Sequence, residues 1–157
     1  MTRLLSSIAL AIATALALAA PLKAQDASEA AEAYAPQKVV YHLNEAGGDD
    51  GAGYKPALNN IQNHINAVGA DNLDLRVVMH GDGVGLLQAA KDNQQLQGLI
   101  SGLKTEGVRF LVCNNTLVGR EIDAEADLFD VWPEDIVPSG VAELAKLQTE
   151  GFVYIKP

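Results

Sequence analysis

From Lys38 onward, short apolar runs alternate with segments whose apolar residues recur at helical spacing, and no other feature constrains the fold as strongly. The runs predict strands, and the segments between them predict helices. Because strands that alternate with helices are joined by right-handed crossovers, we predict a mainly parallel sheet covered by helices on both faces. The predicted strands are 39–43, 73–79, 108–112, 136–137 and 152–155. The predicted helices are 56–68, one broken or two short helices over 86–103, and a helix that Ser139 caps and Gly151 ends.

Polar clusters follow three of these strands. The ligand sites of open α/β sheets form beyond the carboxyl ends of the strands, so we expect the three clusters to share one edge of the sheet. The clusters are His42 with Asn44 and Glu45, His80 with Gly81, Asp82 and Gly83, and Cys113 with Asn114, Asn115 and Thr116.

Cys113 is the only cysteine of the chain, so it cannot close an intrachain disulfide. It is therefore a buried inert thiol, a reactive thiol or half of an intermolecular disulfide. Free cysteines are among the most buried residues, which favours the first reading. The segment after Cys113 is expected to turn into a helix, whose free N–H groups and dipole stabilise a thiolate, which favours the second. Alternation places Cys113 on the same strand face as Leu111, and this does not decide between them.

His80 is the candidate partner of Cys113. It can donate or accept a proton there if the two strand ends are neighbours. The alternative is a histidine that only hydrogen-bonds its adjacent loop. His64, in the middle of the predicted helix 56–68, is expected at the surface.

Other motifs point to neither a nucleotide nor a metal. The glycine-rich stretches 47–53 and 81–85 complete neither phosphate-binding pattern, and their aspartates repel phosphate. Residues 121–135 hold seven acidic residues, but their spacing fits no EF-hand loop. We expect these acids to be solvated, with Phe129 and Trp132 anchoring the loop or packing against another subunit. There is no Cys/His metal signature, so we predict no metal and no cofactor.

The N-terminal residues predict export. Residues 1–24 combine the positive Arg3, a short apolar run and a small residue, Ala24, before the expected cleavage point, as in a signal peptide. Residues 25–37 are predicted to be a flexible tether, and 38–157 one domain. We therefore expect a periplasmic or otherwise exported protein that is soluble after cleavage. The net charge of −9 disfavours nucleic acid and anionic membranes as partners.

Several segments together resemble the DsrE-like family. They cover nearly the whole chain from about Lys38 to Pro157, and Asn114 stands where the family's C-G-N-T-L pattern has glycine. The segments are Val108 to Leu117, Val78 to Gly81 with Gly83, Leu58 to Asn60, Val137 to Glu143, and Gly151 to Pro157.

The resemblance implies a flavodoxin-like three-layer sandwich with a five-stranded parallel sheet, often assembled into trimers or hexamers. It also implies that Cys113 carries sulfane sulfur as a persulfide, received from or passed to a protein or a small polysulfide. Cys113 and His80 are then the candidate catalytic residues. The candidate binding residues are Asn44, Gly81, Gly83, Asn114, Asn115 and Thr116.

Two other functions fit the same residues. One is a non-catalytic, oligomeric module that binds a small ligand and has a buried Cys113. The other is a redox sensor that forms an intermolecular disulfide through Cys113.

Overall fold

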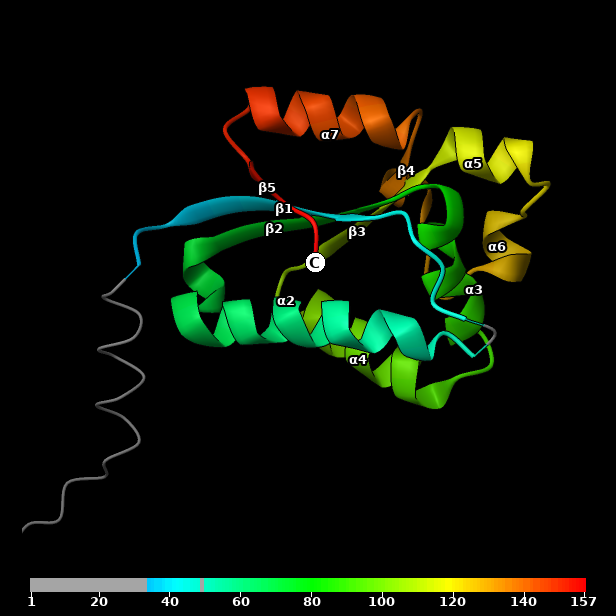
Figure 1. The fold of residues 1–157 in the computed structure, drawn as a ribbon, viewed down its shortest axis with the longest axis horizontal. Coiled ribbons are helices and arrows are strands. Elements are labelled where there is room, and N and C mark those ends of the chain that lie inside the picture. The colour runs from blue at the N-terminus through cyan, green and yellow to red at the C-terminus, as the bar shows by residue number, and fades with distance from the viewer. Residues whose placement is uncertain (1–33, 49) are drawn as a thin grey trace, which may run out of the picture.

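The fold is described from a computed structural model over residues 34–48 and 50–157 (Figure 1). The predicted signal peptide, 1–24, and the tether up to residue 33 lie outside the described residues. All five predicted strands are present, and they form one sheet in the order β4-β3-β2-β1-β5 with every neighbouring pair parallel. The strands are β1 (Gln37–Leu43), β2 (Leu73–Met79), β3 (Arg109–Cys113), β4 (Ile136–Val137) and β5 (Val153–Ile155).

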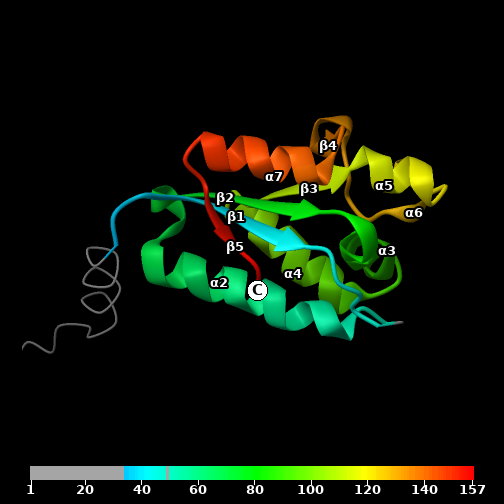
Figure 2. The same ribbon diagram turned by 45° about the horizontal axis from the view of Figure 1, so that its top comes forward.

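Helices cover both faces of this sheet, which confirms the predicted α/β three-layer fold. Figures 1 and 2 show α2 and α4 on one face, α7 on the other, and α3, α5 and α6 beyond the carboxyl ends of the strands. The helices are α2 (Lys55–Val68), α3 (Gly85–Ala90), α4 (Gln94–Thr105), α5 (Asn114–Gly119), α6 (Ala124–Asp127) and α7 (Gly140–Thr149). No helix in the described part of the chain has the length and apolar character needed to cross a bilayer.

Two cores of unequal size lie on either side of the sheet. In β2, Leu75, Val77 and Met79 face the larger core under α2 and α4, whereas Val78 faces the smaller core under α7. This follows from the alternation of side chains along a strand. The smaller core is made of Val40, Val78, Leu111, Leu144, Leu147 and Phe152.

The helix over the smaller core begins and ends as the sequence predicts. The Ser139 hydroxyl accepts a hydrogen bond from the N–H of Ala142, at 3.4 Å, and so caps α7. Gly151 has a φ of 92°, and the N–H of Phe152 then bonds the Leu147 carbonyl. This fixes the N-terminus of α7 over the carboxyl ends of β2 and β3.

One local expectation is wrong. His64 is half-buried rather than at the surface, and its ring contacts two residues of β1. Its Nδ1 is 3.0 Å from the Tyr41 hydroxyl, and its Nε2 is 2.8 Å from Oε1 of Gln37. The helical spacing did not predict this contact, because it marks only apolar residues as buried, and His64 is a polar residue of α2 that packs against β1.

Candidate functional site

His80 and Cys113 lie side by side at the carboxyl edge of the sheet. Met79 of β2 is in register with Val112 of β3, so the residues that follow them leave the sheet together. Gly140, the first residue of α7, packs against both. A Cβ built on Gly140 would lie 3.0 Å from the Cβ of His80 and 3.2 Å from that of Cys113. A larger residue at this position would push α7 or its two neighbours apart by a few tenths of an ångström.

The thiol of Cys113 is nearly buried but surrounded by hydrogen-bond donors. Cys113 ends β3, is the N-cap residue of α5, and is 5% exposed. Burial raises its pKa, but hydrogen bonds from the Gly140 N–H, the Thr116 hydroxyl and the N–H groups of Thr116 and Asn115 outweigh it. The net effect is a thiol pKa below its usual value. The structure thus combines the burial expected of an inert thiol with the electrostatics expected of a reactive one.

Thr116 links the loop after β2 to the cysteine. Thr116 Oγ1 accepts a hydrogen bond from the N–H of Gly81, at 2.9 Å. The same hydroxyl, which keeps its own proton to donate, helps to lower the pKa of the Cys113 thiol. Gly81 adopts a left-handed conformation, with φ of 55°, that favours glycine. Two of the predicted binding residues thus act on the cysteine.

Gly83 lies against the backbone of β1. It lies in a short 3-10 helix, η3 (Gly81–Val84), which packs directly on the end of β1. A Cβ on Gly83 would lie 2.0 Å from the carbonyl oxygen of Leu43. The N–H of His80 also donates to that oxygen, at 3.2 Å. Gly83 therefore lets the loop that carries His80 sit against β1.

The remaining predicted binding residues do not converge on the thiol by their side chains. Asn114 and Asn115 are exposed, and Asn115 acts through its backbone N–H. The side-chain oxygen of Asn44 accepts a hydrogen bond from Lys156, at 2.7 Å, and Lys156 also pairs with Glu45, at 2.8 Å. Asn44 therefore holds the C-terminal tail against the end of β1.

The hydrogen-bond partner of His80 is a residue that the sequence did not assign a role. His80 Nε2 lies 2.7 Å from Nε2 of His42, and the two rings stack with centroids 4.7 Å apart. His42 Nδ1 in turn lies 2.7 Å from the hydroxyl of Tyr154. Burial, the neighbouring His80 and then Lys156 lower the pKa of His42. Burial and then Lys156 lower the pKa of His80.

A sizeable cavity opens beside this cluster. Its volume is about 1000 Å³, and it lies between the two glycine-rich stretches, with Gly47, Tyr54, Asp82 and Arg120 in its wall. Neither Cys113 nor His80 lines it. Within residues 34–48 and 50–157, no three His, Cys, Asp or Glu side chains are grouped to hold a metal ion.

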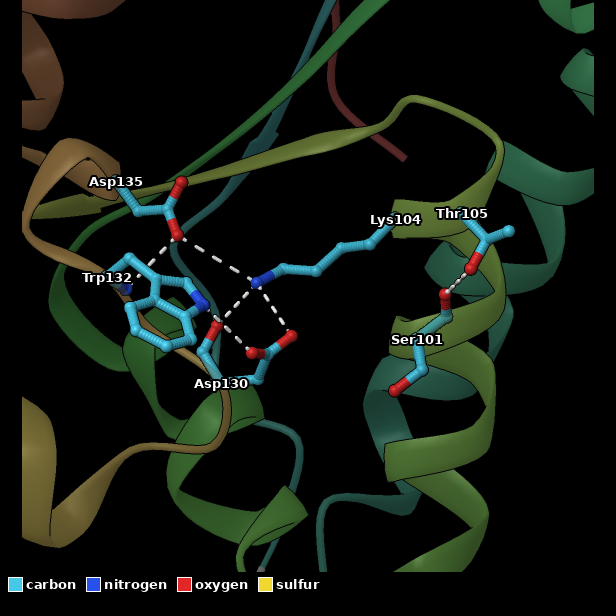
Figure 3. Close-up of polar contacts among 6 residues, drawn as sticks. All are labelled: Ser101, Lys104, Thr105, Asp130, Trp132 and Asp135. Carbon is cyan, nitrogen blue, oxygen red and sulfur yellow. Dashed lines mark hydrogen bonds and ion pairs between the residues drawn. The ribbon is translucent and has the colours of Figure 1, made fainter.

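Lys104 anchors the C-terminal part of the acidic segment. Figure 3 shows Lys104 of α4 reaching Asp130 and Asp135. Its Nζ lies 2.9 Å from Oδ2 of Asp130 and 3.8 Å from that of Asp135, and it also donates to the Asp130 carbonyl. The indole N–H of Trp132 donates to Asp130, at 3.1 Å, although the ring is 59% exposed. Part of the segment expected to be solvated therefore fixes the loop that leads into β4.

Comparison with known proteins agrees with this architecture. The model of the DsrE/DsrF-like family matches residues 6–157. A protein of unknown function from Methanobacterium thermoautotrophicum, MTH1491, has a similar structure with a TM-score of 0.63 and 32% identity; the match covers 77% of this chain and 99% of that one. The ychN protein from E. coli is 20% identical with a TM-score of 0.54 and the same coverage, which shows the fold alone. No curated protein matches the chain.

Proposed function

The chain belongs to the DsrE/DsrF-like family, and from this premise we propose that it is a sulfur-handling protein in which Cys113 accepts or relays sulfane sulfur as a persulfide. Family membership supports a role of the sulfur-relay type in general terms. The observation that carries the specific proposal is the set of donors around the thiol, which lower its pKa although it is almost buried. A thiol with this environment is present as thiolate at a lower pH than a free cysteine.

The transfer needs no external oxidant. The thiolate of Cys113 attacks the terminal sulfur of a persulfide or polysulfide, and a new bond forms between Sγ and that sulfur. The bond between the terminal sulfur and the donor breaks, and its electron pair leaves on the donor sulfur, which then takes up a proton. The N–H groups of Gly140, Thr116 and Asn115 stabilise the anionic sulfur before and after the transfer.

The burial of the thiol favours a small donor. A residue that is 5% exposed leaves little room for a second protein to place its own sulfur against Sγ. The redox-sensor function is disfavoured more strongly, because an intermolecular disulfide also requires the two Cβ atoms to come within about 4.5 Å. We therefore propose an inorganic polysulfide or a small persulfide as the donor.

The protein works outside the cytoplasm in this proposal. The predicted signal peptide, residues 1–24, supports export to the periplasm, and the net charge of −9 supports a partner other than nucleic acid. We also propose that the domain assembles with copies of itself, as a trimer or hexamer.

The second candidate function is the non-catalytic module that binds a small ligand. The observations that favour it are the 5% exposure of Cys113 and the separate cavity of about 1000 Å³. The two functions differ in one property, which is whether sulfur can be loaded onto Cys113 in the folded protein.

The proposal is tested by incubating the folded mature protein with polysulfide and measuring its intact mass. The account predicts mass gains in steps of one sulfur atom that disappear on reduction and are absent from Cys113→Ser. If Cys113 gains no sulfur and labels with an alkylating reagent only after unfolding, the carrier function is wrong and the binding module remains.

A further inference from the structure

Four side chains that can carry a proton or an ionisable sulfur form a row across the sheet. They are Tyr154 on β5, His42 on β1, His80 at the end of β2 and Cys113 at the end of β3. These strands are consecutive neighbours in the sheet. The row thus runs from one edge strand to the cysteine without a gap in strand order.

All four side chains lie on the face covered by α7. Side chains alternate along a strand, so residues two apart share a face. Each of the three central strands has a residue of the smaller core, and two positions later comes His42, His80 or Cys113. Tyr154 is in register with the core residue of β1, Val40. These core residues are Val40, Val78 and Leu111.

The row runs from solvent to a buried residue, and it is joined by hydrogen bonds as far as His80 and by packing from there to Cys113. Two hydrogen bonds of 2.7 Å join Tyr154 to His42 and His42 to His80. Gly140 then packs against both His80 and Cys113. Tyr154 is 40% exposed and Cys113 is 5% exposed, so the open end of the row is the tyrosine.

We propose that Tyr154, His42 and His80 form a proton relay that serves the buried thiol of Cys113. The inference rests on the proposed function of Cys113 in sulfur transfer and adds to it the source and destination of the proton.

The contact between the two histidines explains how the relay works. A hydrogen bond between two Nε2 atoms holds one proton. If both nitrogens carried a proton, the two protons would repel each other, and if neither did, two lone pairs would face each other. The pair can therefore carry one positive charge, and that proton can cross from His42 to His80 without rotation of either ring. The Tyr154 hydroxyl accepts from Nδ1 of His42 when that nitrogen carries a proton, as it does in the charged ring, and donates to it when that nitrogen is bare.

The relay completes the proton balance of the transfer. The neutral pair takes the proton of the Cys113 thiol, and the thiolate attacks the sulfane sulfur. The charged pair then gives this proton to the donor sulfur as its bond breaks. If the leaving sulfur departs without this proton, the charged pair releases the proton to solvent through His42 and Tyr154 and becomes neutral again.

Other charged groups near the pair are themselves paired. Lys156 faces both rings but lies 2.8 Å from the carboxylate of Glu45. On the other side, Asp82 of η3 lies 2.7 Å from Arg120, which follows α5. Between about pH 5 and 8, the two histidines and the Cys113 thiol are therefore the groups at this edge that can change protonation.

The test is the pH dependence of Cys113 alkylation by a small reagent, measured in wild type and in His42→Gln. Glutamine keeps a hydrogen-bonding side chain at this position but cannot titrate. Wild type is expected to show two inflections, because the thiol and the histidine pair ionise as coupled groups. His42→Gln is expected to lose the lower one and to load sulfur from polysulfide about 10²-fold more slowly, at the low end of what general acid–base catalysis contributes.

Two further variants complete the test. Tyr154→Phe removes the acceptor of the charged ring at an exposed position and is expected to move the lower inflection to lower pH, which keeps the test valid if His42→Gln does not fold. His64→Gln, on the opposite side of β1, is the matched control and is expected to leave both inflections in place.

The outcomes separate the relay from the proposed function. If wild type loads sulfur but His42→Gln and Tyr154→Phe keep its pH profile and rate, the relay is wrong and the carrier function stands. If wild type shows both inflections and the variants lose or move the lower one, the relay is supported even where no sulfur is loaded. A thiol that labels only after unfolding overturns both.

Discussion

Gly140 packs its backbone against Cys113, so that a Cβ built on it would lie only 3.2 Å from the Cβ of the cysteine, and its N–H helps to hold the pKa of the thiol below the usual value. The N-terminus of α7 thus sets both the electrostatics and the packing of the cysteine. Because the contact is made by backbone, a change of side chain at residue 140 tests it.

We expect Gly140→Ala to destabilise the protein by about 1 kcal/mol, because Cys113 and His80 must shift by a few tenths of an ångström to admit the new methyl group. It should also slow alkylation of Cys113 near neutral pH, since α7 must move away from the thiol. Chemical denaturation and labelling rates measure the two effects. The control is Gly98→Ala in α4, where nothing lies within 4 Å of the new Cβ, and it should stabilise by about 0.5–1 kcal/mol. Equal effects of the two substitutions would contradict the contact.

The Thr116 hydroxyl is expected to hold down the pKa of the Cys113 thiol. Thr116→Val keeps the shape but removes the donor, so the pKa should rise and alkylation at neutral pH should slow by about 10-fold, since a hydrogen bond to a charged group is lost. Thr116→Ser keeps the hydroxyl and should behave as wild type. A normal labelling rate for the valine variant would show that the backbone N–H groups alone stabilise the thiolate.

His64 makes the protein less stable in acid. Burial lowers its pKa, and the neutral ring donates from Nε2 to Gln37 while Nδ1 accepts from Tyr41. The unfolded chain therefore binds more protons than the folded one below the ordinary histidine pKa of about 6.5. Stability should be fully present above that pH and fall as the pH drops through it. Urea denaturation at a series of pH values measures this.

In His64→Gln the fall should become smaller but not vanish, because His42 and His80 also have lowered pKa values. If the free energy of unfolding of His64→Gln depended on pH as in wild type, the contact with Tyr41 would not favour the neutral form of the His64 ring.

Lys104→Met should release the acidic loop. The substitution removes the cation shared by Asp130 and Asp135, and the second of these carboxylates is nearly buried. We expect a loss of about 1–2 kcal/mol in the free energy of unfolding. Lys146→Met is the control, because the Lys146 side chain is 59% exposed and its pair with Glu143 within α7 should contribute less than about 1 kcal/mol. If both substitutions cost the same, the loop does not depend on Lys104.

The sequence predicted the fold because the fold depends on local patterns. The predicted bounds of β2 are those observed, since its apolar residues alternate between two buried faces. Ser139 and Gly151 bound α7 as expected, because capping and a left-handed turn are local events. β1 begins at Gln37, within the stretch assigned to the tether, because pairing with β2 extends a strand beyond its apolar residues.

The candidate site was predictable only in outline. Parallel strands brought His80 and Cys113 to one edge, as the alternation of elements implies. The bond between His42 and His80 could not be predicted, because it depends on how two rings rotate across neighbouring strands. The closeness of Gly83 to Leu43 likewise arises from tertiary packing, and no sequence pattern marks it.

The most direct test of the account is to map sulfur to a residue. The folded mature protein is loaded with a limiting amount of polysulfide, the persulfides are trapped by alkylation, and the peptide that contains Cys113 is identified by mass spectrometry. The account predicts that the trapped persulfide lies at Cys113, with no more than one per chain, and that a sample reduced before trapping has none. A Cys113 peptide that carries only the alkyl group, or stays unlabelled until the protein is unfolded, would contradict it.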